Sequence, residues 1–211
     1  MRTDNRSRRE SRSPGTTLHA ILCDRDGTLI EDRHYLSDPA QIKLLPGVEH
    51  ALRRFTRAAC RLFVVSNQSG VGRGYFNLES AHACNTRLAR LLAAHDVHVT
   101  DMLLCPHGPE DGCACRKPLT GMWDVLRERH GLHAKHTAMI GDKRDDVRFG
   151  RAAGLRTVLV LTGQGRDQAT TLGLPLPDAG FWTPSEPPPP DSPHAVAADL
   201  AAAVDFLMPP L

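Results

Sequence analysis

The chain has 211 residues, which is enough to bury one good-sized core, so we expect a single domain with appendages rather than two domains. Charged residues make up 24% of the chain and nearly balance at a net charge of +2, which excludes a strong overall attraction to nucleic acid or to an acidic membrane. No segment of the sequence is long and apolar enough to span a bilayer.

A basic arm, residues 1–17, contains five arginines and no apolar stretch. It is therefore neither a secretory signal nor a membrane anchor. Its composition is typical of solvated chain, and we expect this arm to be disordered. A zinc-bearing module that binds nucleic acid through the arm remains the alternative from a different functional class.

Short apolar runs alternate with helical segments after the arm. In chain order we expect a strand at 18–24, a helix at 47–59, a strand at 61–66, a helix at 78–94, a strand at 97–105, a helix at 121–130, a strand at 136–142, a short helix ending at 153 and a strand at 156–161. Leu52, Phe55 and Ala59 share one face of the first helix. Asn77 can cap the second helix, and Gly131 can close the third.

The rest of the chain is less regular. Residues 166–193 are rich in proline, glycine and threonine, and we expect an irregular segment there. Residues 194–211 read as a short strand or turn and a helix that close the core, whose main part is 18–165. Strands that alternate with helices of these lengths imply an α/β fold with a parallel sheet and helices on both faces.

Three of the predicted strands end in a polar residue, namely Asp24, Ser66 and Asp142. In parallel sheets the ligand binds outside the carboxyl ends of the strands. We therefore expect these three residues, which are distant in the sequence, to meet at one site.

Asp24 and Asp26 lie two residues apart in the run DRDGT. In extended geometry both side chains project the same way, with Cα atoms about 6.6 Å apart, and the gap can hold a phosphoryl group and a cation. Gly27 allows the chain to turn away from the sheet. Two carboxylates repel phosphate unless a hard cation lies between them, and oxygen ligands of this kind favour Mg²⁺. A carboxylate nucleophile would form an aspartyl-phosphate, while the second carboxyl group would move the proton.

Two aspartates at this spacing, without other motifs, more often cap or turn a strand end. Here three further elements follow in order. In SNQSGVGRGY, the Ser66 hydroxyl and successive backbone N–H groups can hold phosphate oxygens. Lys117 in CRKP supplies a cation that balances the transferring phosphoryl group. GDKRDD places Asp142 on the metal, with Asp145 or Asp146 in support.

Half of the six cysteines crowd into one loop beside a histidine. The set is Cys105, His107, Cys113 and Cys115. It is a complete Cys₃His set, typical of a closed, structural Zn²⁺ site with no ligand position left for water. We expect the zinc-binding loop, 105–115, to hold Arg116 and Lys117 in place. The clustering favours a metal over disulfides and thus the reducing cytoplasm.

The four phosphate-site elements resemble, in order and spacing, the motifs of the haloacid dehalogenase superfamily. The resemblance implies a phosphatase with a Rossmann-like core and minimal caps. It implies Asp24 as the nucleophile and Asp26 as the general acid/base. Ser66 and Lys117 would complete the catalytic set by binding phosphate. Mg²⁺ would be held by Asp24, Asp142 and the main-chain carbonyl of Asp26.

The segments around these motifs resemble the branch of the superfamily that acts on heptose 1,7-bisphosphate or histidinol phosphate. They are more similar to the heptose type, which implies removal of a 7-phosphate on the route to nucleotide-activated heptose. Histidinol phosphate or another small sugar phosphate remains the alternative. The implied substrate contacts are Asp32, Arg33, His34, Tyr35, Ser66, Asn67, Gln68, Ser69, Arg116, Lys117 and Lys143. Arg116 suits a second phosphate. We expect a monomer whose partner is a small phosphorylated sugar, with neither nucleic acid nor a membrane as a partner.

Overall fold

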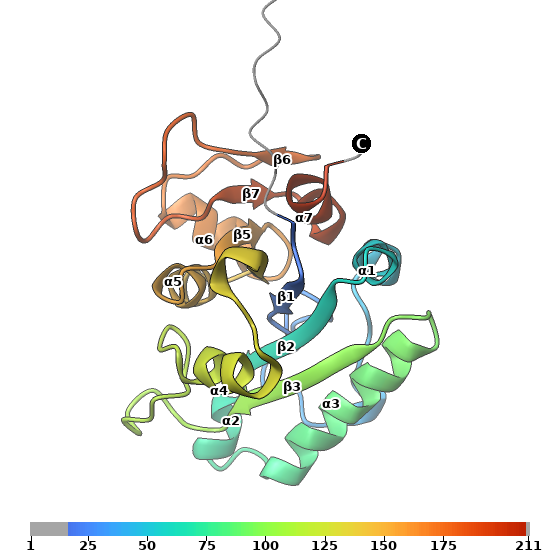
Figure 1. Cartoon of the computed structure of the whole chain (residues 1–211). Helices are drawn as coiled ribbons and strands as arrows, with labels where there is room; N and C mark the ends of the chain where they lie inside the picture. Colours follow the sequence, from blue (N-terminus) through green and yellow to red (C-terminus); the bar gives the residue numbers. More distant parts are fainter. Residues whose placement is uncertain (1–16, 210–211) are drawn as a thin grey trace, which may run out of the picture.

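A computed structural model describes residues 17–209 of the chain (Figure 1). The predicted basic arm lies outside the described residues apart from Thr17. Seven strands form one sheet. They are β1 (Ala20–Cys23), β2 (Arg61–Asn67), β3 (Val99–Cys105), β4 (Thr137–Gly141), β5 (Arg156–Val160), β6 (Phe181–Trp182) and β7 (Ala195–Ala197). Their spatial order is β3-β2-β1-β4-β5-β7-β6, and all neighbours are parallel except β7 and β6.

Helices cover both faces of this sheet (Figure 1). They are α1 (Val48–Arg57), α2 (Ser69–Gly72), α3 (Leu78–Ala93), α4 (Gly121–His130), α5 (Arg144–Ala152), α6 (Gly165–Thr171) and α7 (Leu200–Leu207), with the short 3₁₀ turns η1 (Pro39–Gln41) and η2 (Ala134–His136). Between residues 17 and 209, no helix combines the length and the apolar character that a membrane crossing requires. The α/β prediction, a parallel sheet with helices on both faces, is confirmed.

Alternation along the central strand β1 explains why both faces are apolar. Ile21 and Cys23 join the core that α1, α3 and α7 close, whereas Ala20 and Leu22 join the core under α4 and α5. All four side chains are completely buried. Burial of each large aliphatic side chain contributes about 1.5–3 kcal/mol, so a strand of only four residues is firmly held.

The winding of the sheet reverses at β1. The chain moves from β1 to β2 and β3 on one side, then returns to place β4 and β5 on the other. Cys23 is paired with Ile140, so the residues that follow β1 and β4 emerge next to each other. Reversal points of this kind are where open α/β sheets bind ligands.

Two predictions about the elements are wrong. Ala59 does not belong to the buried face of α1, because that helix ends at Arg57 and Ala59 is exposed with a φ of 54°. The turn it makes is closed by the Cys60 amide, which donates to the Phe55 carbonyl. The segment 166–193 is not wholly irregular either.

Helix α6 and strand β6 occupy part of that segment because they cover apolar surface at the sheet edge. Ala169 of α6 packs with Leu159 and Val196 from β5 and β7. The Asn77 cap of α3 and the left-handed Gly131 after α4 are confirmed.

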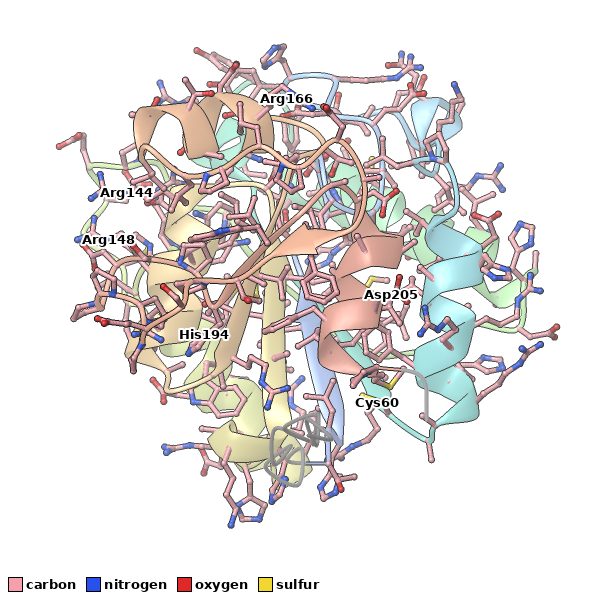
Figure 2. All side chains as sticks on the ribbon, turned by 90° about the horizontal axis from the view of Figure 1, so that it is seen from above. Cys60, Arg144, Arg148, Arg166, His194 and Asp205 are labelled. Carbon is pink, nitrogen blue, oxygen red and sulfur yellow. The ribbon has the colours of Figure 1, made fainter. Side chains whose placement is uncertain are left out.

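The proline-rich run is anchored to α5. Arg151 donates to the carbonyl oxygens of Pro188, Pro189 and Pro190 and contacts the His194 ring at 2.6 Å. Arg144 and Arg148, which lie on the same side of the molecule as His194 in Figure 2, contact the Asp191 carboxylate. These arginine contacts hold the segment against the core.

Candidate active site and metal cluster

A cavity of about 250 Å³ opens at the carboxyl ends of β1 and β2. Most of the residues expected to act on substrate line it, namely Asp24, Asp26, Asp32, His34, Tyr35, Ser66, Asn67, Gln68, Ser69, Arg116, Lys117 and Lys143. Leu36, Gly70, Asp145, Asp146 and Gln164 also line the cavity without having been singled out as substrate contacts. The structure does not bring Arg33 into the lining, and its guanidinium pairs with Glu31 instead.

Asp24 lies at the bottom of the cavity and is only 4% exposed. Its amide continues the sheet by donating to the Ile140 carbonyl, which fixes the backbone from which the carboxylate projects. Burial by itself would raise the pKa of this carboxyl group. The nearby ammonium groups of Lys117 and Lys143 outweigh burial and hold the pKa of Asp24 below its ordinary value. Asp24 therefore remains an anion that can act as a nucleophile.

Lys117 has all three of its ammonium hydrogens engaged. Its Nζ lies 2.6 Å from Asp24 Oδ1, 2.6 Å from Asp146 Oδ1 and 2.7 Å from the Val65 carbonyl oxygen. Burial opposes the charge, but the two carboxylates outweigh it and raise the pKa of Lys117. Asn67 fixes the Lys117 backbone, accepting from its N–H and donating to its carbonyl, both at 3.0 Å.

A group of oxygens converges on the Lys143 ammonium. Nζ lies 3.2 Å from Asp142 Oδ1, 3.3 Å from the Asp26 carbonyl oxygen and 3.8 Å from Asp24 Oδ2. These are the three oxygen donors expected to hold Mg²⁺, and here they surround the ammonium group of Lys143. An all-oxygen set of this charge fits a hard divalent cation. Burial, and then repulsion from Asp24, raises the pKa of Asp142 to about 7, although the Lys143 ammonium opposes this rise.

Gly27 is needed for this close approach. Its φ is 83°, and a Cβ at this position would lie 2.2 Å from Asp142 Oδ2. The Gln164 amide donates to the same Asp142 oxygen at 2.9 Å, and the Gln164 side chain donates to Asp32 Oδ2 at 3.1 Å. Asp146, rather than Asp145, is the buried supporting carboxylate, since its oxygen pairs with Lys117. The sequence left open which of these two aspartates supports Asp142, and burial identifies Asp146.

Gln68 connects two of the expected catalytic residues. Its Nε2 donates to Asp26 Oδ2 at 2.9 Å and to Ser66 Oγ at 2.7 Å. Because Ser66 Oγ accepts this bond, its own hydroxyl hydrogen is available to a phosphate oxygen. Asp26 is also bonded by the neighbouring Arg25, a residue that the sequence interpretation passed over.

The mouth of the cavity is formed by a strained segment. His34 and Tyr35 have φ values of 45° and 53°, which is uncommon for two consecutive residues that are not glycine. The Tyr35 ring meets the Tyr75 ring edge-on, with centroids 4.7 Å apart. Tyr35 lines the cavity and Tyr75 is 60% exposed, so this aromatic pair lies at the entrance.

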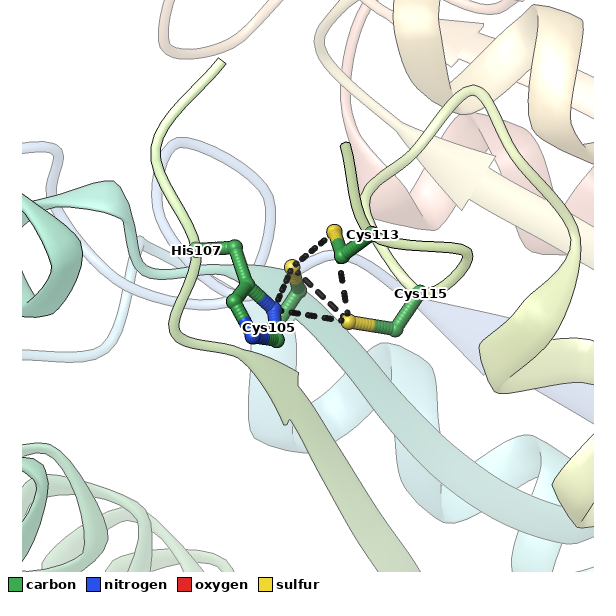
Figure 3. A group of neighbouring side chains, drawn as sticks. All are labelled: Cys105, His107, Cys113 and Cys115. Atoms are coloured by element: carbon green, nitrogen blue, oxygen red, sulfur yellow. Dashed lines mark hydrogen bonds between the residues drawn. The ribbon is translucent and has the colours of Figure 1, made fainter. Parts of the chain in front are cut away.

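The four expected zinc ligands form a compact cluster at the end of β3 (Figure 3). The donor atoms of five of the six pairs lie 3.0 to 3.6 Å apart. Four donors about 2.3 Å from one ion at tetrahedral corners would be about 3.8 Å apart, so small outward shifts would fit Zn²⁺. All six cysteines are free. Three thiols and an imidazole therefore form a donor set of suitable chemistry and size.

This cluster is linked to the cavity through the backbone. The Gln68 amide donates to the Cys105 carbonyl at 2.7 Å, and Gly72 of α2 donates to the Pro106 carbonyl at 2.8 Å. Arg116 donates to the His107 carbonyl at 3.3 Å. A change in the loop would thus reach both Gln68 and Arg116.

Known proteins resemble this chain in both sequence and fold. A family model described as haloacid dehalogenase-like hydrolase matches residues 34–154, and a related model matches 114–203. A D-glycero-beta-D-manno-heptose-1,7-bisphosphate 7-phosphatase of Bordetella bronchiseptica is 36% identical over 159 residues, covering 75% of this chain and 89% of the relative. A D-glycero-D-manno-heptose-1,7-bisphosphate 7-phosphatase of Thermosynechococcus vestitus is 34% identical, covering 89% of this chain and 94% of the relative.

Among solved structures, the D,D-heptose 1,7-bisphosphate phosphatase from B. bronchiseptica, complexed with magnesium and phosphate, matches with a TM-score of 0.77. It is 33% identical, and the match covers 90% of this chain and 98% of that one.

Proposed function

Because the chain belongs to the haloacid dehalogenase-like hydrolases and is a phosphatase, we propose that it removes the 7-phosphate of D-glycero-D-manno-heptose 1,7-bisphosphate. Two observations support this substrate. The relatives named for this activity match most of the chain. The cavity also holds Arg116, for which the described part of the chain provides a carbonyl contact but no carboxylate partner.

The guanidinium of Arg116 suits a second phosphate on the substrate because it presents several donors in one plane. A bisphosphate bound with one phosphate at Asp24 would bring its other phosphate toward this group. This arrangement supports a bisphosphate over a monophosphate. The reaction would serve the formation of nucleotide-activated heptose.

In the proposed mechanism, an Asp24 carboxylate oxygen attacks phosphorus and the bond from phosphorus to the sugar oxygen breaks. That oxygen keeps the bonding electrons and takes a proton from Asp26. Asp26 then accepts a proton from water as the water oxygen attacks phosphorus and releases Asp24. The Ser66 hydroxyl donates to a phosphoryl oxygen, and the Lys117 ammonium, which stays bonded to Asp24, supplies positive charge beside the phosphoryl group.

Asp24, Asp142 and the Asp26 carbonyl would hold Mg²⁺, which supplies positive charge between the nucleophile and the phosphoryl oxygens when bound. The clustered thiols and imidazole would hold Zn²⁺ as a structural ion. Carboxylates select the harder ion and thiolates the softer one, so the two sites should not compete.

Phosphate release in Mg²⁺ tests the proposal, with both anomers of the heptose bisphosphate, fructose 1,6-bisphosphate and histidinol phosphate as substrates. We expect the heptose bisphosphate to give the highest kcat/KM and the 1-phosphate to remain on the product, as read by phosphorus NMR. Asp24→Asn is the control and should be inactive, with deamidation excluded by mass. A marked preference for histidinol phosphate would overturn the proposed substrate but not the phosphatase chemistry.

A further inference from the structure

Arg25 is a completely buried cation between Asp24 and Asp26. Burying a guanidinium away from water is costly unless its donors are paired, so its partners reveal what it does. It does not line the cavity, in contrast to both neighbouring aspartates. Arg25 therefore contacts a residue of the site from outside the cavity and does not contact the substrate.

The Arg25 guanidinium bonds both oxygens of the Asp26 carboxylate. Its Nε lies 3.0 Å from Asp26 Oδ2, and its Nη2 lies 3.2 Å from Oδ1. The remaining terminal nitrogen, Nη1, donates to Asn85 Oδ1 at 2.9 Å. Asn85 is itself only 6% exposed and belongs to α3. The acid/base side chain is thus connected through Arg25 to a helix outside the phosphate-binding elements.

This geometry fixes the plane of the Asp26 carboxylate. Two nitrogens of one rigid guanidinium fork contact both oxygens, since Nη2 lies 3.0 Å from Oδ2 as well as 3.2 Å from Oδ1, and a single ammonium group cannot fix the plane in this way. Gln68 adds a bond to Oδ2, so Oδ1 is the oxygen with fewer donors. The position of the fork is in turn set by Asn85.

We propose that Arg25, held by Asn85, is the positioning residue that aims the Asp26 carboxyl group at the leaving oxygen of the substrate. The inference rests on the proposed role of Asp26 as the proton donor. A general acid contributes only when it lies within hydrogen-bond reach of the atom that it protonates. Charge alone at position 25 is therefore not sufficient.

Substrates with different leaving groups distinguish this positioning role from a merely structural one. When the bond from phosphorus to oxygen breaks, an alkoxide leaving group needs the Asp26 proton, whereas 4-nitrophenolate departs as a stable anion. A misaimed Asp26 should slow phosphoryl transfer to Asp24 much more for alkyl phosphates than for 4-nitrophenyl phosphate. A general loss of fold or of phosphate binding would slow both alike.

The test measures kcat and KM for a sugar phosphate and for 4-nitrophenyl phosphate in Arg25→Lys, Asn85→Leu and Asp26→Asn. Arg25→Lys keeps the charge without the fork, and Asn85→Leu removes the support of the fork. For both variants we expect kcat/KM, which reports formation of the aspartyl-phosphate and not its shared hydrolysis, to fall on the order of 10- to 100-fold more for the sugar phosphate than for the aryl phosphate. Thr157→Val, which removes a buried hydroxyl on β5, is the stability control and should leave this ratio unchanged.

If Asp26→Asn changes the ratio but Arg25→Lys and Asn85→Leu do not, the positioning role is refuted and the proposed function stands. If Asp26→Asn leaves the ratio unchanged, the general-acid function itself fails, and the inference fails with it. Should Arg25→Lys not fold, Asn85→Leu decides the question. Thermal unfolding of each variant establishes which case applies.

Discussion

Removal of the Lys117 charge should have a large effect on both stability and catalysis. The Lys117→Met variant keeps the length of the side chain but leaves Asp24 and Asp146, both buried, without the ammonium that lies 2.6 Å from each. Breaking a buried ion pair by removing one partner costs about 3–5 kcal/mol. For a chain of this size we expect the Tm to fall on the order of 10 °C.

Thermal unfolding without Mg²⁺, and phosphate release with it, measure the two effects. The pH dependence has a defined sign. In the wild type, Lys117 and Lys143 outweigh burial and lower the pKa of Asp24, so its contribution to stability is present above the unfolded pKa of about 4 and is lost as the pH falls through the folded pKa. In the variant, protonation relieves the unpaired charge, so the deficit should be largest near pH 7 and should shrink toward pH 5.

The double variant Lys117→Met with Asp146→Asn is the matched control. It removes one of the two unpaired charges and should regain part of the lost Tm without regaining activity, because Asp24 still lacks its partner. An unchanged Tm in Lys117→Met at pH 7, together with normal kcat, would refute the reasoning. A fall in Tm that the double variant does not relieve would locate the cost in packing rather than in charge.

Three further predictions concern Arg116, the zinc-binding loop and the end of the proline-rich segment. Arg116→Ala should raise KM for a bisphosphate at least tenfold more than for a monophosphate, whereas Arg129→Ala, whose partner is the remote Asp101, should change neither KM. Cys113→Ser should lose about one zinc ion per chain by metal analysis and lower both Tm and kcat/KM; unchanged values of both would show that the cluster positions nothing. Burial, and then Arg151, lowers the pKa of His194 to about 4, so its contribution to stability is present above about pH 6.5 and is lost as the pH falls toward 4. Urea unfolding should show that His194→Asn loses about 2 kcal/mol less than the wild type between pH 7 and pH 4.5, after allowance for partial exposure, and equal losses would contradict this.

The sequence was sufficient to predict those elements whose physical cause lies within one short segment. The apolar run before Asp24 has to be buried, and the Asn77 and Gly131 caps depend on residues that are adjacent in the chain. The prediction for Ala59 is wrong because its left-handed turn is imposed by the step from the end of α1 to the start of β2 at Arg61, and no glycine marks this turn.

Other features arise only from distant contacts. Helix α6 is stable because Ala169 packs on two strands of the sheet, although its sequence has little apolar character. Gln164 reaches Asp142 and Asp32 only because β5 ends beside β4. Arg33 lies within the expected substrate segment, yet the turn at His34 leaves it outside the cavity.

The sequence by itself determined the family of this protein and its phosphatase activity, because the carboxylates and the lysine occur in the order and at the spacings typical of that family. The tertiary structure decided which of these groups face one another. Asp146 rather than Asp145 pairs with Lys117, and Arg25 turns away from the cavity to bind Asp26 and Asn85. The spacing of residues along a strand sets the side of the sheet to which each side chain points. Burial and the packing of remote helices set its partner, and therefore its charge and its role.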